Sequence, residues 1–450
     1  MTASNAGFSK EAQDAVYAES FEPHKIKLID HGALSLYERL SLIKSAKKSL
    51  ELEFFIFNID KSSRLVTQAL LEKAKEGVQI RLLVDFSAPV FQLRPAYAKL
   101  MSDAGIQVKY YNTSAMYKLF TVQHRSHRKL LIVDGQSVLT GGRNIADDYF
   151  DLSDHYNFLD SDVLLTGPLV KTIQSSFNLY WNSDLAAEPK AVEKEILKLD
   201  LDNAMAYLTL REEDITTLEK LEKLKSQNTD HEEHTCNDTI FVTDFPGAGE
   251  SHRKIYSTII KLISEAKTSV LIESPYFVLR QEGYDSFKNM IDRKLNVTVL
   301  TNGLFSTDAF YVISPLLLNL NWIAEIGLDL YLYQGKPLKT NSVPTSDQEI
   351  RWGIHAKRAV LDEQTVLIGT YNIDPRSANL NSELMIVCKN NPAFAKQVLQ
   401  SIQGRLDQST LIISDKKVLD KDALMKNAPL KQKIMTYLAI PFATSFDFIL

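Results

Sequence analysis

One polar pattern occurs twice in this chain of 450 residues, and it limits the possible folds more than any other feature. Residues 127–144 are HRKLLIVDGQSVLTGGRN, and residues 355–372 are HAKRAVLDEQTVLIGTYN. A single His-x-Lys could be an ordinary exposed pair on a strand, but two copies with identical intervals argue against that explanation. The positions that agree are His127 and His355, Lys129 and Lys357, Asp134 and Asp362, Gly141 and Gly369, and Asn144 and Asn372.

The surroundings of the motif are repeated as well. The segment 45–57 matches 265–277, and each follows an amphipathic stretch with helical spacing. Further apolar runs of strand length then alternate with helical segments in the same order in both halves. This alternation predicts an α/β fold in which two similar halves, related by a pseudo-twofold axis, each contain a mixed sheet covered by helices.

The repeat also divides the chain. We expect an N-terminal extension at 1–24, a first lobe at 25–185, a connecting segment at 186–248, a second lobe at 249–412 and a C-terminal tail at 413–450. The connecting segment is rich in charge and has leucines at helical spacing, so we expect it to carry no chemistry.

Charge and cysteine content narrow the classes of partner and compartment. The net charge is -5, whereas a protein that binds nucleic-acid phosphates usually has a basic excess, so we expect no nucleic-acid partner. The chain has no apolar run of about 18 residues and no signal-peptide core, which predicts no membrane-spanning helix. Two cysteines in so long a chain do not form a disulfide framework, and we expect Cys236 and Cys388 to be free thiols.

Strand geometry predicts which side chains of the repeated motif share a face. Alternate residues of a strand share a face, so His127 and Lys129 point one way and Arg128 points the other. The Asp-Gly dipeptide at 134–135 is a strong hairpin signal, and the returning strand brings Asn144 back toward His127. Pairing the two halves would therefore gather two histidines, two lysines and two asparagines around one cavity.

Such a cavity suits a phosphodiester. Lysine ammonium and asparagine amide groups stabilise the non-bridging oxygens, where negative charge concentrates during transfer. One imidazole can attack phosphorus while the other protonates the leaving oxygen, and this scheme needs no metal and no cofactor. The residues expected to do this are His127, His355, Lys129 and Lys357, with Asn144 and Asn372 binding the phosphate.

Acidic residues are needed to orient the histidines, because a nucleophilic imidazole must present a neutral nitrogen. Asp160 or Asp162 could do so in the first half, since alternation places both on one face, and Glu383 in the second. Asp134 and Asp362 are counted with the catalytic motif. Because each lies at a hairpin turn, however, a role in holding the turn or a salt bridge behind the lysine is at least as well founded.

Two other polar features are weaker candidates for a functional site. Arg143 and Arg376 could contact the phosphate or pair with surface acids. The segment HEEHTC at 231–236 contains His231, His234 and Cys236, but it lacks the spacing of a tetrahedral metal site. We expect a solvated polar loop there and no metal.

The doubled H-x-K-x-x-x-x-D motif, each copy followed by Gly and Asn, resembles the phospholipase D superfamily. The segments GGRNIADDYFD, GTYNIDPRSANLNSE and YWNSDLA are similar to bacterial cardiolipin synthases, particularly the C-type branch. The resemblance implies the phospholipase D fold, with two α/β/α sandwich lobes, one active site at their interface and a covalent phosphatidyl-histidine intermediate. It implies that His127 is the nucleophile, His355 the general acid and then base, Asp160 the partner of the first histidine and Glu383 that of the second.

The resemblance also favours one activity among three. It implies a phosphatidyltransferase of cardiolipin synthase type acting on phospholipids such as phosphatidylglycerol, and it leaves open the donor lipid and whether the acceptor is glycerol, phosphatidylglycerol, phosphatidylethanolamine or water. A hydrolytic phospholipase D is the nearest alternative, because water can resolve the same phosphohistidine, and the motif residues do not separate the two. A nuclease of the same superfamily is disfavoured by the net charge.

Contact with the membrane is expected to be peripheral, at a bacterial inner membrane, and the oligomeric state stays open. Two stretches could make this contact. The first contains Met116, Tyr117, Leu119 and Phe120. The second is the tail, whose packing on the enzyme's own core is an equal alternative; its residues of interest are Lys431, Lys433, Ile434, Tyr437, Leu438, Phe442 and Phe446.

Overall fold

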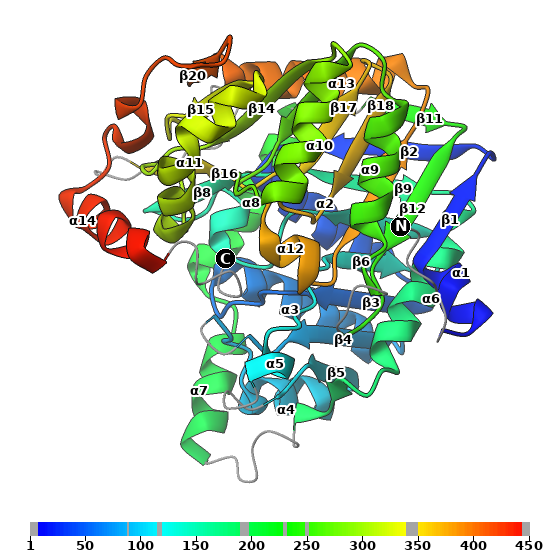
Figure 1. Cartoon of the computed structure of the whole chain (residues 1–450). Coiled ribbons are helices and arrows are strands. Elements are labelled where there is room, and N and C mark those ends of the chain that lie inside the picture. Colours follow the sequence, from blue (N-terminus) through cyan, green and yellow to red (C-terminus); the bar gives the residue numbers. More distant parts are fainter. Residues whose placement is uncertain are drawn as a thin grey trace.

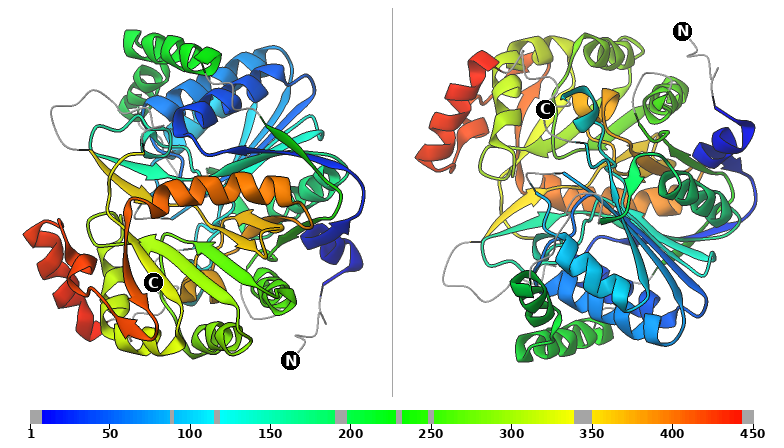
Figure 2. Two further views of the ribbon diagram at one scale, coloured as in Figure 1. Left: turned by 90° about the horizontal axis from the view of Figure 1, so that it is seen from above. Right: turned by 90° about the horizontal axis from the view of Figure 1, so that it is seen from below.

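Two mixed β-sheets and the helices around them make up the molecule (Figure 1, Figure 2). This computed structural model describes residues 8–87, 90–114, 119–189, 198–227, 232–247, 252–338 and 350–442. Each sheet has helices on its outer face, and α6 (Leu169–Trp181) and α13 (Pro392–Leu406) contribute to an apolar cluster shared by the two sheets. The predicted α/β class with two similar lobes is therefore confirmed.

The first sheet has the strand order β10-β5-β4-β3-β6-β7-β9-β2-β11. Its strands are β10 (Ala186–Ala187), β5 (Ile106–Tyr111), β4 (Gln79–Asp85), β3 (Ser49–Phe54), β6 (Leu130–Val133), β7 (Ser137–Gly141), β9 (Asp162–Thr166), β2 (His24–Ile29) and β11 (Glu233–Cys236). Its outer helices are α2 (Gly32–Ser45), α3 (Lys61–Lys75) and α4 (Pro95–Asp103), over which α7 (Lys198–Leu208) and α8 (Glu212–Gln227) pack as a further layer.

The second sheet has the order β1-β12-β19-β18-β17-β13-β14-β15-β20-β21. Its strands are β1 (Tyr17–Ser20), β12 (Thr239–Thr243), β19 (Leu384–Cys388), β18 (Thr365–Gly369), β17 (Arg358–Leu361), β13 (Ser269–Glu273), β14 (Asn296–Asn302), β15 (Asp329–Tyr333), β20 (Ser409–Ser414) and β21 (Lys417–Val418). Its outer helices include α9 (Ile255–Glu265), α10 (Gln281–Asp292) and α11 (Ile313–Ile326), joined at the sheet end by the short α12 (Pro375–Asn379) (Figure 1).

The remaining elements are short or peripheral. They are α1 (Lys10–Val16), α5 (Leu119–Val122), α14 (Leu430–Ala439), the strands β8 (Tyr156–Leu159) and β16 (Arg351–Ile354), and the 3-10 turns η1 (Asp147–Tyr149), η4 (Phe310–Val312), η5 (Asp422–Met425) and η6 (Ile440–Phe442). No helix in the described ranges is long and apolar enough to cross a membrane.

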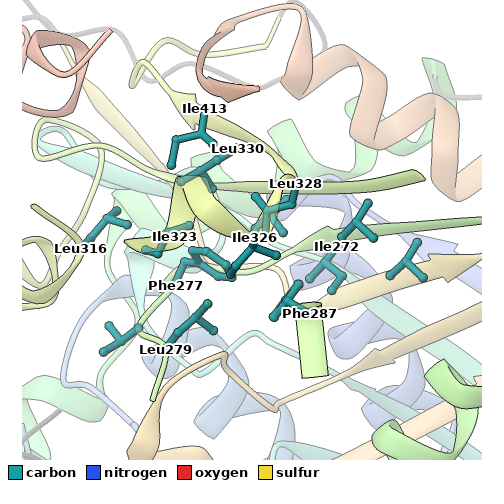
Figure 3. Packing of buried hydrophobic residues seen from close by; sticks show 14 of the residues in the cluster. Ile272, Phe277, Leu279, Phe287, Leu316, Ile323, Ile326, Leu328, Leu330 and Ile413 are labelled. Atoms are coloured by element: carbon teal, nitrogen blue, oxygen red, sulfur yellow. The ribbon is translucent and has the colours of Figure 1, made fainter. Parts of the chain in front are cut away.

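Strand alternation sorts the side chains of the motif hairpins into separate cores. In β6, Leu130 and Ile132 belong to the cluster between the two sheets, whereas Leu131 and Val133 belong to the cluster under α2 and α3. The equivalent outer cluster of the second lobe lies under α9, α10 and α11 (Figure 3). Each hairpin turn has left-handed backbone, at Asp134 and Gly135 in the first and at Asp362 and Glu363 in the second, as the predicted hairpins require.

The two lobes exchange edge strands. β1, from the predicted N-terminal extension, pairs with β12 in the second sheet, and β11 pairs with β2 in the first sheet. The chain therefore crosses between the sheets near both of these strands. The domain limits expected from the sequence stay a prediction.

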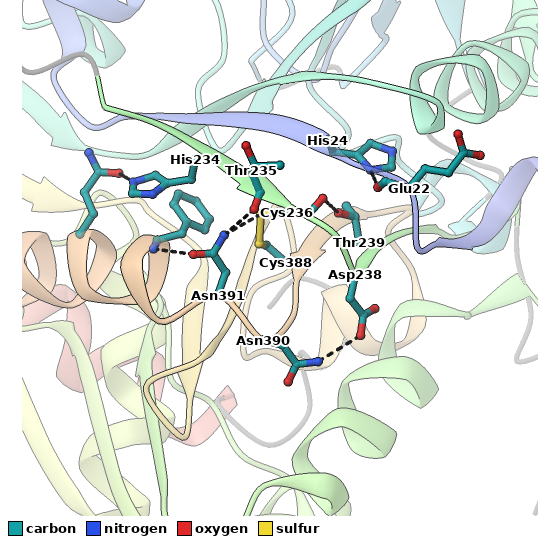
Figure 4. The surroundings of a disulfide bond; sticks show 12 residues. Glu22, His24, His234, Thr235, Cys236, Asp238, Thr239, Cys388, Asn390 and Asn391 are labelled. Carbon is teal, nitrogen blue, oxygen red and sulfur yellow. Dashed lines mark hydrogen bonds between the residues drawn. A yellow bond between two sulfur atoms is a disulfide. The ribbon is translucent and has the colours of Figure 1, made fainter.

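A disulfide joins Cys236 to Cys388, so the expectation of two free thiols is wrong (Figure 4). Cys236 ends β11 of the first sheet and Cys388 ends β19 of the second, with a Cα–Cα distance of 5.8 Å. The exchange of edge strands brings these two ends together across a sequence separation of 152, which no local pattern could indicate. Residues 233–236 are also a strand and not the expected polar loop.

The stretches expected at the membrane are described in part. Met116, Tyr117 and Phe446 lie outside the described residues, as does His231 of the HEEHTC segment. Leu119 and Phe120 belong to α5 and Phe442 to η6, although only their backbone is described. In α14, Ile434, Tyr437 and Leu438 are exposed by 49%, 57% and 62%, so these side chains do not pack back on the core.

Candidate active site

Backbone hydrogen bonds across the lobe interface position both motif histidines. The His127 N–H donates to the Ser382 carbonyl at 2.9 Å, and the His355 N–H donates to the Leu159 carbonyl at 2.8 Å. β16, which leads into His355, also runs parallel to β8 of the first lobe. Ser382 precedes Glu383 and Leu159 precedes Asp160, so each histidine is held next to an acid of the other lobe. The two backbone contacts are equivalent under the pseudo-twofold axis.

The acids pair with the histidines across the interface. Nδ1 of His127 lies 2.9 Å from Oε2 of Glu383, and Nδ1 of His355 lies 2.6 Å from Oδ2 of Asp160. The expected pairing of Asp160 with His127 and of Glu383 with His355 is therefore wrong. Sequence order suggested partners within one lobe, whereas the docking of the lobes places each acid opposite the other motif. Neither half holds a complete histidine–acid pair by itself.

Glu383 is held by two hydroxyl groups that the sequence did not single out. Thr370 Oγ1 donates to Oε2 and Ser377 Oγ donates to Oε1 at 2.8 Å. Both residues lie in the segment 369–383, in which Asn372, Arg376 and Glu383 were the expected candidates. A small hydroxyl residue two positions before that asparagine is a weak signal, because only the fold brings its oxygen to the carboxylate.

Burial makes both imidazoles neutral at physiological pH. It lowers the pKa of His127 to about 4, although Glu383 acts in the opposite direction. It lowers the pKa of His355 to about 3, with a further decrease from the Lys357 ammonium. A charged carboxylate beside each Nδ1 favours the tautomer in which Nδ1 is protonated, and in that tautomer Nε2 carries the lone pair. The site can thus present two basic nitrogens, one from each lobe.

The acids stay charged for the opposite reason. Burial alone would raise the pKa of Glu383, but His127 and Lys129 beside it bring the value below the ordinary one. The pKa of Asp160 is likewise lowered despite burial, by His355 and Lys357. A charged carboxylate behind each ring favours the imidazolium that forms when the ring takes up a proton.

The two lysines have equivalent places. Lys129 donates from Nζ to the His127 carbonyl, and Lys357 donates from Nζ to the His355 carbonyl. Both are buried, and burial lowers their pKa values, that of Lys357 to about 8 and that of Lys129 well below its ordinary value. One lysine from each lobe thus borders one buried site, and a protonated ammonium group there suits an anionic ligand.

The asparagines differ in their partners. Oδ1 of Asn144 accepts from the Ile56 N–H at 3.0 Å, and its amide nitrogen donates to the Tyr149 hydroxyl at 2.9 Å. Oδ1 of Asn372 is buried without a hydrogen-bond partner in the part of the chain that the structure describes. Phosphate binding by these two amides stays a prediction.

Asp134 and Asp362 do not reach the histidines, so their place among the catalytic residues is a correction. Asp134 accepts from the backbone N–H groups of Lys47, Lys48 and Ser49 at 2.9, 2.7 and 2.9 Å. Asp362 accepts from those of Lys267, Thr268 and Ser269 at 2.8, 2.7 and 3.0 Å. Each carboxylate fixes the chain that enters the neighbouring strand, at the hairpin end remote from the motif histidine. The alternative of holding the turn is the one that the geometry supports, and among the described residues neither acid forms a salt bridge with a lysine.

Arg143 and Asp162 form a separate buried ionic cluster with Arg39. Nη1 of Arg143 and Nη1 of Arg39 each lie 3.0 Å from Oδ2 of Asp162. Arg143 also donates to the carbonyls of Ile29 and Asp160, so it contacts neither a surface acid nor the open side of the site. The choice between Asp160 and Asp162 is thereby settled by contact, since only Asp160 meets a catalytic histidine.

The remaining polar candidates fall outside the site. Arg376 donates to Oε1 of Gln123 at 2.9 Å, and Nε2 of His234 lies 3.1 Å from Oε1 of Gln397. Among the described residues, no group of three or more His, Cys, Asp or Glu side chains is arranged to hold a metal ion.

Comparison with known proteins agrees with this geometry. The sequence profile of the family described as "Cardiolipin synthase, PLD-like domain" matches residues 40–181 and 259–406, which contain one motif each. Cardiolipin synthase C of Escherichia coli (strain K12) is 28% identical over 396 residues, covering 82% of this chain and 81% of that protein. An uncharacterized protein of Helicobacter pylori (strain ATCC 700392 / 26695) is 30% identical over 408 residues, covering 85% of this chain and 79% of that protein.

A solved structure extends the comparison to the fold. The crystal structure of phosphatidylserine synthase from Haemophilus influenzae Rd KW20 covers 94% of this chain and 95% of its own, with a TM-score of 0.67 and 15% identity. At this identity the similarity concerns the fold, which includes both lobes and their mutual arrangement.

Proposed function

Because this chain belongs to the family of cardiolipin synthase, PLD-like domains, we propose that it transfers a phosphatidyl group to the head-group alcohol of a second phospholipid through a phosphohistidine intermediate. The family membership makes it a phospholipid phosphatidyltransferase of the phospholipase D superfamily. The observation that carries the finer proposal is the crossed pairing of the two neutral histidines with two charged acids in one buried site.

The first half-reaction would break the bond between phosphorus and the donor head-group oxygen. Nε2 of His127 attacks phosphorus with its lone pair, and the leaving oxygen takes a proton from His355. His355 can carry that proton once the anionic phosphodiester is bound, because a nearby negative charge raises the proton affinity of an imidazole. Lys129 and Lys357 would stabilise the charge on the non-bridging oxygens.

The second half-reaction would reverse these roles. His355, now neutral, removes the proton of the incoming alcohol, whose oxygen forms a bond to phosphorus as the bond to His127 breaks. With the head-group glycerol of phosphatidylglycerol as acceptor the product is cardiolipin, whereas water would give phosphatidic acid. Resolution by water is the second candidate function, since nothing in the histidine geometry discriminates between the two acceptors.

A product assay tests the proposal. Purified protein is given phosphatidylglycerol, with and without phosphatidylethanolamine, and products are identified by mass spectrometry. Cardiolipin as the main product supports transfer, and its dependence on phosphatidylethanolamine would identify the donor. Phosphatidic acid as the sole product would overturn transfer in favour of hydrolysis.

We also propose that α14 is part of the surface through which the enzyme touches the membrane. Leu430, Ile434, Tyr437 and Leu438 are exposed on this helix, and Lys431 and Lys433 lie between them, as in helices that bind an anionic interface. Replacing Ile434 and Leu438 with Ser should decrease binding to phosphatidylglycerol vesicles in a flotation assay by about tenfold. Replacing the exposed Leu419 with Ser serves as the control, and equal binding by both variants would contradict the proposal.

A further inference from the structure

The second lobe contains an apolar cavity of about 150 Å³ between its outer helices and its sheet. Helices α9 and α10 lie side by side above it, and strands β13, β17, β18 and β19 form its floor (Figure 1). Ile272, Leu279 and Phe287, which are labelled in Figure 3, are among the residues that line it. The lining is mostly aliphatic and aromatic, so water gains little by entering.

This cavity reaches the second motif lysine. Lys357, Ala359 and Leu361 all line it, and strand alternation puts these three side chains on the same face of the sheet as His355. Asp374, at the start of α12, lines it as well. The cavity therefore begins beside the second motif lysine and extends away from it under α9 and α10.

The first lobe fills the corresponding space with charge. Gly141 pairs with Asp162 in the first sheet and Gly369 pairs with Met385 in the second, so Met385 takes the place of Asp162. The intervals of the duplicated motif put Tyr371 where Arg143 stands. Ile259 takes the place of Arg39, since each precedes the first residue of the matching strand by the same interval. All three members of the ionic cluster thus have cavity-lining counterparts in the second lobe: Met385, Tyr371 and Ile259.

Side-chain size follows the same trend. Leu131, buried in the first lobe, is replaced at the equivalent position of the second motif by Ala359, which lines the cavity. The second lobe thus has apolar side chains in place of three ionic ones, and the smaller Ala359 in place of Leu131, where its cavity lies.

We propose that this cavity binds an acyl chain of the donor phospholipid while its phosphate lies between the two histidines. The inference rests on the proposed function and specifies how its substrate is held. An acyl chain is the occupant that fits, because most of the lining is aliphatic or aromatic and Lys357 of the second motif lies at its wall. The phosphatidyl group bound to His127 must place its glycerol and chains beside the site, and in the first lobe the matching positions hold the ionic cluster of Arg39, Arg143 and Asp162.

Photo-crosslinking tests the occupant without relying on turnover. A phosphatidylglycerol with a diazirine in one acyl chain is irradiated with the His127→Ala variant, and the labelled peptides are mapped by mass spectrometry. Labels in α9 and α10, at residues 255–265 and 281–292, are expected. The control is an irradiated sample that also contains excess unlabelled phosphatidylglycerol. The inference would be overturned if labelling did not exceed this control, or if the labels were confined to other elements.

Filling the cavity tests its effect on substrate choice. Ala359→Leu restores the side chain of the first lobe, and Ile259→Phe fills the space from α9 in case the first variant does not fold. Each buried methylene contributes about fourfold to affinity. The wild type should therefore have a kcat/KM for didecanoyl phosphatidylglycerol at least about tenfold higher than for dihexanoyl phosphatidylglycerol. Both donors are compared in detergent micelles at the same surface fraction. The filled variants should reduce this preference to less than threefold while they keep turnover of the dihexanoyl donor.

The outcomes separate the inference from the function on which it rests. A preference unchanged in both filled variants would overturn the acyl-chain site although transfer itself stands. No phosphatidyl product from either donor in the wild type would overturn the proposed function, and the crosslinking result would then decide by itself whether the cavity binds a chain. The exposed Leu419→Phe variant serves as the control and should behave as the wild type.

Discussion

The two lobes carry the same motif but differ directly behind it. In the first lobe, Arg39, Arg143 and Asp162 form a buried ionic cluster between α2 and the sheet. In the second lobe, Ile259, Tyr371 and Met385 hold the equivalent places and border an empty apolar space. The duplication has thus kept the motif histidines and lysines and changed the wall behind them, so that one half has an ionic cluster where the other has an apolar cavity.

The largest expected effects come where the two lobes are equivalent. His127→Ala and His355→Ala should each decrease kcat by at least about 10⁴-fold, because attack and proton transfer form one chemical unit. A donor with a p-nitrophenol leaving group distinguishes the two roles, since this group needs no general acid. Release of p-nitrophenol should return in a single turnover of the His355→Ala variant but not in the His127→Ala variant. Rescue of both variants, or of neither, would contradict the assignment of the nucleophile.

The acids should be equivalent as well. Glu383→Gln and Asp160→Asn keep the size of each side chain but remove the charge that stabilises an imidazolium, and each should decrease kcat by about 10²- to 10⁴-fold. The measurement is steady-state kinetics on micellar phosphatidylglycerol, with thermal unfolding as the control for folding. If kcat decreased in only one variant, the other histidine would not need its acid. The two histidine–acid pairs would then be equivalent in structure but not in catalysis.

Stability should distinguish the lobes. Asp162→Ala leaves two buried arginines without their carboxylate and should lower the free energy of unfolding by about 3–5 kcal/mol. Met385→Ala, at the matching position, enlarges a space that is already present and should cost about 2 kcal/mol, near the lower limit for buried methionine. Denaturant unfolding of both variants measures the difference. Equal costs would indicate that the ionic cluster is no more important to the first lobe than ordinary packing is to the second.

The smallest expected effect is on pH dependence. Because burial lowers the pKa of Lys357 to about 8, this group loses its proton and its positive charge as the pH rises through that value. The kcat/KM should therefore decrease above about pH 8. Lys357→Arg should move this decrease to higher pH, since a guanidinium stays charged, even if its maximal activity is lower. An unchanged alkaline limb in that variant would assign the decrease to another group, of which Lys129 is the first candidate.

Much of the site was predictable because its chemistry repeats along the chain. The spacing of His127, Lys129 and Asn144 against His355, Lys357 and Asn372 was enough to predict two similar lobes with one shared phosphate site. The hairpins also followed from local rules, because Asp134 and Gly135 adopt the left-handed backbone that a tight turn requires. The role of Asp134 in fixing the chain before β3 was among the alternatives that the turn position suggested.

The errors concern contacts between segments far apart in sequence. The partner of each histidine was assigned to its own lobe, and Cys236 and Cys388 were expected to be free, because nothing local indicates which strand ends meet. Thr370 and Ser377 were missed for the same reason, since a hydroxyl group is functional only if the fold directs it to a carboxylate.

The amino-acid sequence by itself determined the secondary structure of the motif hairpins, the twofold plan and which residues are candidates for the chemistry, because these depend on periodicity and residue types within short segments. Only the tertiary structure decided the crossed histidine–acid pairs, the disulfide between the sheets and the cavity beside Lys357. Each of these depends on how two large sheets dock and on which side chains then fill the space behind the site, and both follow from packing of the whole chain.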